Sequence, residues 1–72
     1  MTKNELGIGI KLIEGAYRKK LDKDEIDIWW LIFKNEDFDK FKNNVINYIE
    51  NNHYLPVIAD IKNPPIKFAE LV

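Results

Sequence analysis

The stretch DKDEIDIWWLIF, residues 22–33, decides the fold, because its apolar half is compatible with either a helix or a buried strand. Asp22 followed by Glu25 is the pattern of a capping box, in which each side chain bonds the other residue's backbone amide at a helix start. A short apolar run such as residues 28–33 cannot be assigned by periodicity alone, so a strand is the competing interpretation. The cap favours a helix of about ten residues.

Apolar side chains occur on every side of this expected helix. One face would carry Ile26, Trp29, Trp30 and Phe33, and the other faces would carry Ile28, Leu31 and Ile32. A helix that is apolar all round is normally central and buried. We therefore expect residues 26–33 to form the hub of the core.

Two amphipathic helices are expected, one before and one after this segment. Thr2 and Glu5 repeat the capping-box pattern and predict a helix start, and Asp37 can cap a further helix. The first helix would bury a stripe at helical spacing, Leu6, Ile10, Ile13 and Tyr17. The other would bury Phe38, Phe41, Val45, Tyr48 and Ile49. Both stripes are expected to face the core.

A short fourth helix is predicted from Pro56 to about Lys62. Proline is favoured at the first helical position, because its missing amide would be unpaired there in any case. This helix would bury Val57 and Ile61, and residues 63–72 would form a final turn or a loose C-terminal segment. The sequence therefore predicts an all-α fold, a small single-domain bundle of about four helices spanning residues 1–72.

Composition and charge argue against several classes of protein. Eleven basic and twelve acidic residues give a net charge of -1, whereas a nucleic-acid binder usually has a basic excess, so direct nucleic-acid binding is not expected. The one dense basic run, residues 18–20, is interpreted as a solvated helix end in preference to a phosphate site. Without cysteine, a signal-peptide pattern or a long uncharged apolar stretch, the chain is expected in the cytoplasm, with no membrane contact.

Side chains that support catalysis are scarce. The chain has no serine or cysteine, and its single imidazole, His53, follows Asn51 and Asn52 at an expected helix end, where capping suits it better than base catalysis. The acidic groups lie at helix starts and lack the spacing of a calcium loop, whose third-ligand and glycine positions are occupied by Ile26 and Asp27. We expect no enzyme activity, no cofactor and no metal.

The pair Gly7 and Gly9 is similar to the beginning of a dinucleotide-binding loop. No strand is predicted before it, however, and the third glycine of that motif is missing. A flexible or closely packed helix terminus explains the two glycines better.

After these exclusions, protein binding is the function that the sequence still supports. The adjacent Trp29 and Trp30 are the main candidates for residues that contact a partner. In a helix they point about 100° apart, so one can be buried while the other lies partly at the surface, although the interpretation that both are core residues is the favoured one. Exposed aromatic side chains are frequent binding anchors. Ile8 and Ile28, opposite the main stripes of their helices, would extend an apolar patch. The candidate interaction residues are Trp29, Trp30, Tyr54, Ile8, Ile28 and Phe68.

Residues 54–62, YLPVIADIK, with the preceding Tyr48 and Ile49, resemble the C-terminal part of the folded domain in the phage helicase loader and inhibitor family. Upstream, residues 29–31 with Phe38 and Phe41 keep the aromatic spacing of that family, so the resemblance spans residues 29–62. It implies a compact helical domain that binds a hexameric replicative helicase, holds it inactive and delivers it to an origin-bound replisome organiser. It implies no catalytic residue.

The sequence thus leads to one functional hypothesis and two alternatives. The hypothesis is a non-enzymatic phage or prophage DNA-replication adaptor that binds the replicative helicase or its loader, and the replisome organiser, in the bacterial cytoplasm. The first alternative is a small helical nucleic-acid-binding domain, because three-helix units of this size often bind DNA. The second is a host-takeover inhibitor whose target is unrelated to replication.

Overall fold

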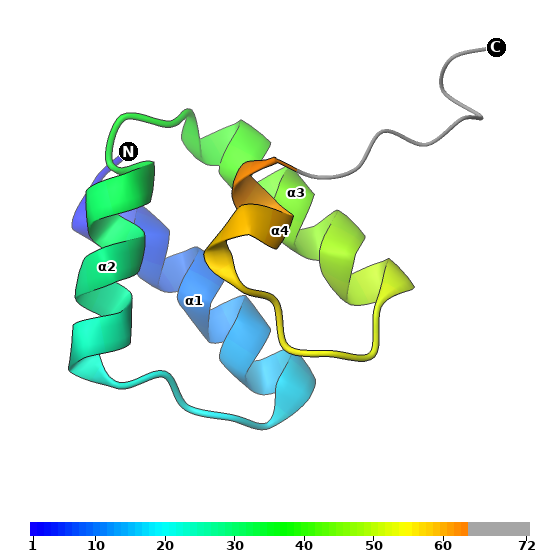
Figure 1. Cartoon of the computed structure of the whole chain (residues 1–72). Coiled ribbons are helices and arrows are strands. Elements are labelled where there is room, and N and C mark those ends of the chain that lie inside the picture. The colour runs from blue at the N-terminus through cyan, green and yellow to red at the C-terminus, as the bar shows by residue number, and fades with distance from the viewer. Residues whose placement is uncertain (64–72) are drawn as a thin grey trace, which may run out of the picture.

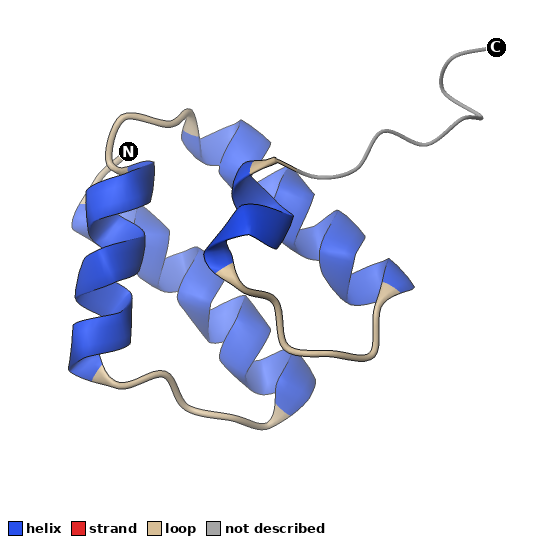
Figure 2. Cartoon of the chain, viewed as in Figure 1, coloured by secondary structure: helices blue, strands red, loops and turns tan. Residues whose placement is uncertain are grey.

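Four helices follow one another along the chain in the computed structural model, which describes residues 1–63 (Figure 1). They are α1 (Lys3–Tyr17), α2 (Lys23–Phe33), α3 (Phe38–Asn51) and α4 (Ile58–Lys62). The described residues contain no strand, so the expected all-α bundle is confirmed and the strand alternative for residues 28–33 is wrong (Figure 2). The prediction of a final turn or loose segment falls, apart from Asn63, outside the described residues.

Three helices begin at the caps that the sequence predicts. Thr2 with Glu5 and Asp22 with Glu25 form complete capping boxes at α1 and α2. In the first, the Glu5 amide donates to Thr2 Oγ1 over 3.1 Å and the Thr2 amide donates to Glu5 Oε1 over 2.8 Å. Asp37 Oδ2 accepts the amide three residues later over 3.0 Å at the start of α3. These local bonds satisfy amides that have no partner inside the helix.

The core lies between α1 and α3, which pack most extensively against each other. Each helix contributes to it, and the buried apolar side chains are Leu6, Ile10, Ile13, Leu21, Trp29, Phe33, Phe41, Val45 and Ile61. Three of the rings form a continuous series: Trp29 stacks on Phe33 at 5.4 Å between centroids, and Phe33 meets Phe41 at 4.9 Å. The predicted stripes of the first and third helices therefore do face the core, although Tyr17, Phe38, Tyr48 and Ile49 lie at its margin.

The prediction that residues 26–33 form a central hub is wrong. Only Trp29 and Phe33 of α2 are buried, whereas Ile28, Leu31 and Ile32 are 54%, 63% and 40% exposed. The reason is the position of α2, which packs against α1 and α4 at the side of the bundle (Figure 1). A domain of this size has too few helices to surround α2 on all sides.

The last helix begins later than predicted, at Ile58, with Val57 as its N-cap. Asp60 Oδ2 accepts the Val57 amide over 3.0 Å, which fixes this start. Pro56 is buried one position before the cap, and Val57 is 63% exposed, so the expected burial of Val57 is wrong. Ile61 is fully buried, as predicted. Pro56 and Ile61 occupy the two positions of a hydrophobic staple, which explains why the proline precedes the helix.

Candidate functional site

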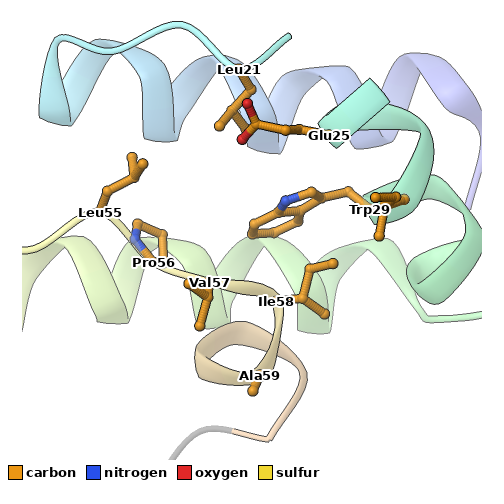
Figure 3. A pocket seen from close by; sticks show the side chains of 9 residues that line it. Leu21, Glu25, Trp29, Leu55, Pro56, Val57, Ile58 and Ala59 are labelled. Atoms are coloured by element: carbon orange, nitrogen blue, oxygen red, sulfur yellow. The ribbon is translucent and has the colours of Figure 1, made fainter. Parts of the chain in front are cut away.

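An apolar groove opens between α2 and residues 55–59, the segment that leads into α4 (Figure 3). Its volume is about 420 Å³. From α2 it is lined by Glu25, Ile28 and Trp29, and Leu21 closes it at the α1–α2 loop. We call this hollow the α2–α4 groove.

The α2 side of the groove combines one buried and one exposed side chain. Trp29 is only 5% exposed and stacks on Phe33, so its indole belongs to the core and also forms the inner wall, where it points toward Pro56 (Figure 3). Ile28, its neighbour in sequence, stands at the rim with 54% of its surface exposed. The groove is therefore a surface extension of the core.

The opposite side of the groove is held in place by contacts of α4. Asn44 Nδ2 on α3 donates to the Ile61 carbonyl over 3.1 Å, and Lys62 Nζ lies 3.0 Å from the Glu36 carboxylate. These contacts hold α4 against α3 and the α2–α3 loop, and Pro56 of the same wall is buried. The exposed Val57 side chain lies on this wall.

The apolar surface continues beyond the groove along the outside of α2. Ile28, Leu31 and Ile32 are all exposed and recur at spacings of three and four residues, so they lie on one side of the helix. We call these three residues the α2 outer face. Single exposed apolar residues are ordinary, but three on one side of a helix make this face a candidate interaction surface.

Negative charge borders the groove at the start of α2. Glu25 is the one charged residue among those that line it, and Asp22, Asp24 and Asp27 lie on the same first turns of the helix. Asp22 and Glu25 accept backbone amides in the capping box. Within residues 1–63 the one ion pair is Lys62–Glu36, so none of these four carboxylates is neutralised by a neighbouring cation.

The structure separates the interaction residues predicted from the sequence. Trp29 and Ile28 come together at the groove, whereas Trp30 is half-buried, with Lys3 Nζ 5.9 Å from the centroid of its ring. Tyr54, 80% exposed, precedes the groove segment without lining it, and Ile8, 48% exposed, lies on α1. Phe68 is outside the described residues. An interaction role for any of the six stays a prediction.

Sequence reasoning missed Leu31, Ile32, Val57 and Ile58 as candidates for this surface. It assigned the α2 residues to a buried hub and Val57 to a buried helix face. A usable signal was present, because residues 28–32 contain more apolar side chains than one helix side can bury in a domain of this size.

A second hollow of about 470 Å³ lies at the C-terminal end of α1 and is lined by polar residues. Arg18, Lys19 and Lys20 are exposed there, and Arg18 ends the helix in a left-handed conformation with φ of 52°. Glu14 Oε2 accepts the Leu21 amide over 2.8 Å. The basic run thus lies at a helix end, as expected.

Groups with an altered pKa lie away from the groove lining. Burial raises the pKa of Tyr17 and Tyr48 above the ordinary value of 10.0, and the Asp60 carboxylate adds to the rise at Tyr48. His53 is exposed. Residues 1–63 hold no group of three or more His, Cys, Asp or Glu placed to bind a metal ion, and none of their helices is long and apolar enough to span a bilayer.

Comparison with known protein families gives a match. The family model for the N-terminal domain of a phage helicase loader/inhibitor matches residues 1–62, a range that includes all four helices. No curated protein and no solved structure matches the chain.

Proposed function

The chain belongs to the phage helicase loader/inhibitor family, whose N-terminal domain it matches over residues 1–62, and from this premise we propose that it is a non-enzymatic adaptor that binds a replicative helicase. Membership confirms the resemblance drawn from residues 29–62 and extends it to α1. In the proposed role the chain keeps the helicase inactive and delivers it to a replisome organiser in the bacterial cytoplasm.

The observation that supports an adaptor is the continuous apolar surface of the α2–α4 groove and the α2 outer face. Ile28, Leu31 and Val57 are each more than half exposed, and keeping such side chains in water is unfavourable unless a partner covers them. The groove lining offers apolar carbon and one carboxylate, with no nucleophile beside a base. Its chemistry therefore supports binding.

The direct test mixes the purified chain with the purified hexameric replicative helicase of the phage or its bacterial host. We expect the two to co-elute in size-exclusion chromatography at micromolar concentrations and the chain to suppress ATP hydrolysis by the helicase. An unrelated hexameric ATPase serves as the specificity control. If the chain and the helicase elute separately at these concentrations, the proposal is wrong.

Nucleic-acid binding has one structural feature in its favour, the basic hollow at the end of α1. Lys11, Arg18, Lys19 and Lys20 lie around it. Binding to phosphates through these residues would weaken steeply as salt concentration rises. A titration of duplex and single-stranded DNA at low salt decides this alternative, and absence of binding to both excludes it.

A further inference from the structure

We infer that the α2 outer face pairs with the same face of a second copy of the chain, with the two α2 helices antiparallel about a two-fold axis. Such self-association lies outside the proposed function and needs no contact with the helicase. The order of the side chains along α2, together with their exposure, supports it.

The outer side of α2 carries acidic, apolar and basic side chains in that order. Asp24 lies four residues before Ile28, and Asp27 lies four residues before Leu31. Lys34 follows Leu31 by three residues and keeps α-helical backbone angles as the C-cap of α2. Residues at these spacings share one side of a helix, and all five are exposed. This side therefore has an apolar centre, a negative start and a positive end.

Charge complementarity identifies a second copy as the occupant. Within residues 1–63 the one ion pair is Lys62–Glu36, so the side chains of Asp24, Asp27 and Lys34 are not paired inside the chain. An antiparallel second copy brings the basic end of each α2 to the acidic start of the other, and it also sets the two helix dipoles against each other favourably. A parallel copy would place like charges together. The outer side of α2 is thus complementary to itself in one orientation.

Apolar and charged contacts form in the same register of this pair. If Ile28 of one copy lies opposite Leu31 of the other, Lys34 of the second copy lies within about 3 Å, along the helix axis, of the levels of Asp24 and Asp27. Asp27 and Lys34 are seven residues apart, which is about two turns, so they lie on the same flank of α2. A two-fold axis between antiparallel helices brings equal flanks together, as an isologous interface requires.

The size of the interface sets its expected strength. Helix α2 has 11 residues and is about 16 Å long, so the paired area falls below the roughly 1,600 Å² of a standard complex. We expect a dissociation constant on the order of 100 µM. Sedimentation equilibrium from about 10 µM to about 1 mM should show monomer converting to dimer. A chain that stays monomeric at the highest concentration overturns the inference.

The apolar centre is tested with two similarly exposed side chains. Leu31 is 63% exposed on the outer face and does not line the α2–α4 groove, whereas Ile8 is 48% exposed on α1. We expect Leu31→Lys to weaken dimerisation about tenfold or more and Ile8→Lys to leave it nearly unchanged. Lysine is a good helix former, and circular dichroism checks that both variants fold. A dimer that Leu31→Lys does not weaken uses another surface, and the inference is then wrong.

The charged ends are tested by reversing them in two separate chains. Lys34→Glu makes both ends of α2 negative, and Asp24→Lys with Asp27→Lys makes both ends positive. Each variant alone should dimerise about tenfold more weakly, whereas an equimolar mixture should restore dimerisation because opposite charges then meet at both ends. Lys40→Glu, at an exposed position on α3, is the control and should change little. A mixture that associates no better than its components contradicts the charge pairing.

The orientation of the helices is tested by cross-linking, for which the absence of native cysteine is an advantage. In the antiparallel register Asp24 lies opposite Asn35 of the second copy, whereas the two Asp24 residues are about 17 Å apart along the axis. On oxidation, Asp24→Cys mixed with Asn35→Cys should form a disulfide between the two chains, and neither variant should link to itself. Self-linking by each variant shows a parallel pair and overturns the inference.

A different protein as occupant of the outer face gives a separate result. If Leu31→Lys abolishes helicase binding while the unmodified chain is monomeric, the face belongs to the helicase contact and the inference is wrong. Dimerisation that Leu31→Lys disrupts, with helicase binding unchanged, supports the second copy.

Discussion

Gly9 of α1 lies directly against the aromatic ring of Phe41 of α3, so close that a β-carbon at position 9 would overlap the ring. Phe41 is 1% exposed, and its ring is also held by Phe33 at 4.9 Å, so it has little freedom to move away. The glycine therefore permits the close approach of the two helices that form the centre of the bundle. The structure favours close packing over flexibility as the explanation of this glycine.

Gly9→Ala should destabilise the domain by about 1–3 kcal/mol, although alanine is the better helix former, because the added methyl overpacks the core. At Gly15, by contrast, a β-carbon would meet nothing within 4 Å. Gly15→Ala should therefore stabilise the domain by about 0.5–1 kcal/mol. Urea unfolding of both variants measures the two effects, and a Gly9→Ala variant as stable as Gly15→Ala would contradict the packing argument.

The two adjacent tryptophans should differ in their contribution to stability. Trp29 is 5% exposed and stacked on Phe33, so Trp29→Ala should cost about 3–5 kcal/mol. Trp30 is half-buried, and Trp30→Ala should cost less. Thermal unfolding compares them, and fluorescence provides an independent measurement. Trp30→Phe, which retains Trp29, should emit at shorter wavelength than Trp29→Phe. Equal destabilisation by both alanine variants would show that both rings are core.

Stability should fall at high pH because of Tyr48. Burial and the nearby Asp60 carboxylate raise the pKa of its phenol above 10.0, so the folded state binds the proton more tightly than the unfolded chain. The resulting stability is fully present below pH 10.0 and is lost as pH rises through the higher pKa of the folded state. Urea unfolding at pH about 9 and about 11 should show a smaller loss for Tyr48→Phe than for the unmodified chain.

Tyr54→Phe is the control for this pH effect, because Tyr54 is 80% exposed. Its loss of stability between the two pH values should equal that of the unmodified chain. If Tyr48→Phe loses as much stability between the two pH values as the unmodified chain, the proposed role of Tyr48 is wrong.

The helix starts were predictable from sequence because their determinants are local. The caps at Thr2, Asp22 and Asp37 each depend on a side chain and an amide three residues away. The start of α4 was not predictable from sequence, since a proline suits both the first helical position and the position before the cap. Burial of Pro56 against the rest of the fold and the Asp60 bond to Val57 select the second arrangement.

The candidate site was only partly predictable, because exposure depends on how many neighbours surround a helix. Helical geometry separates Trp29 from Trp30, but the sequence does not say which ring is buried. Ile28 was identified as a candidate interaction residue because it lies opposite the main apolar stripe of its helix. Leu31 and Val57 were missed, since apolarity alone suggests burial, whereas their exposure depends on which neighbouring helices cover them in the folded domain.

Asn44 should anchor α4, and with it one wall of the α2–α4 groove. Its Nδ2 donates to the Ile61 carbonyl over 3.1 Å, one of the last carbonyls of α4, which have no partner inside so short a helix. Asn44→Ala should cost about 1 kcal/mol of stability and speed amide hydrogen exchange in residues 58–62.

Asn43→Ala isolates the effect of this bond. Asn43 precedes Asn44 on α3 and is exposed, so both substitutions gain the same helix propensity and only Asn44→Ala loses the contact with α4. The difference in unfolding free energy between the two variants therefore measures the anchor itself. Identical hydrogen exchange in residues 58–62 of the two variants would show that burial of Ile61 holds α4 without this hydrogen bond.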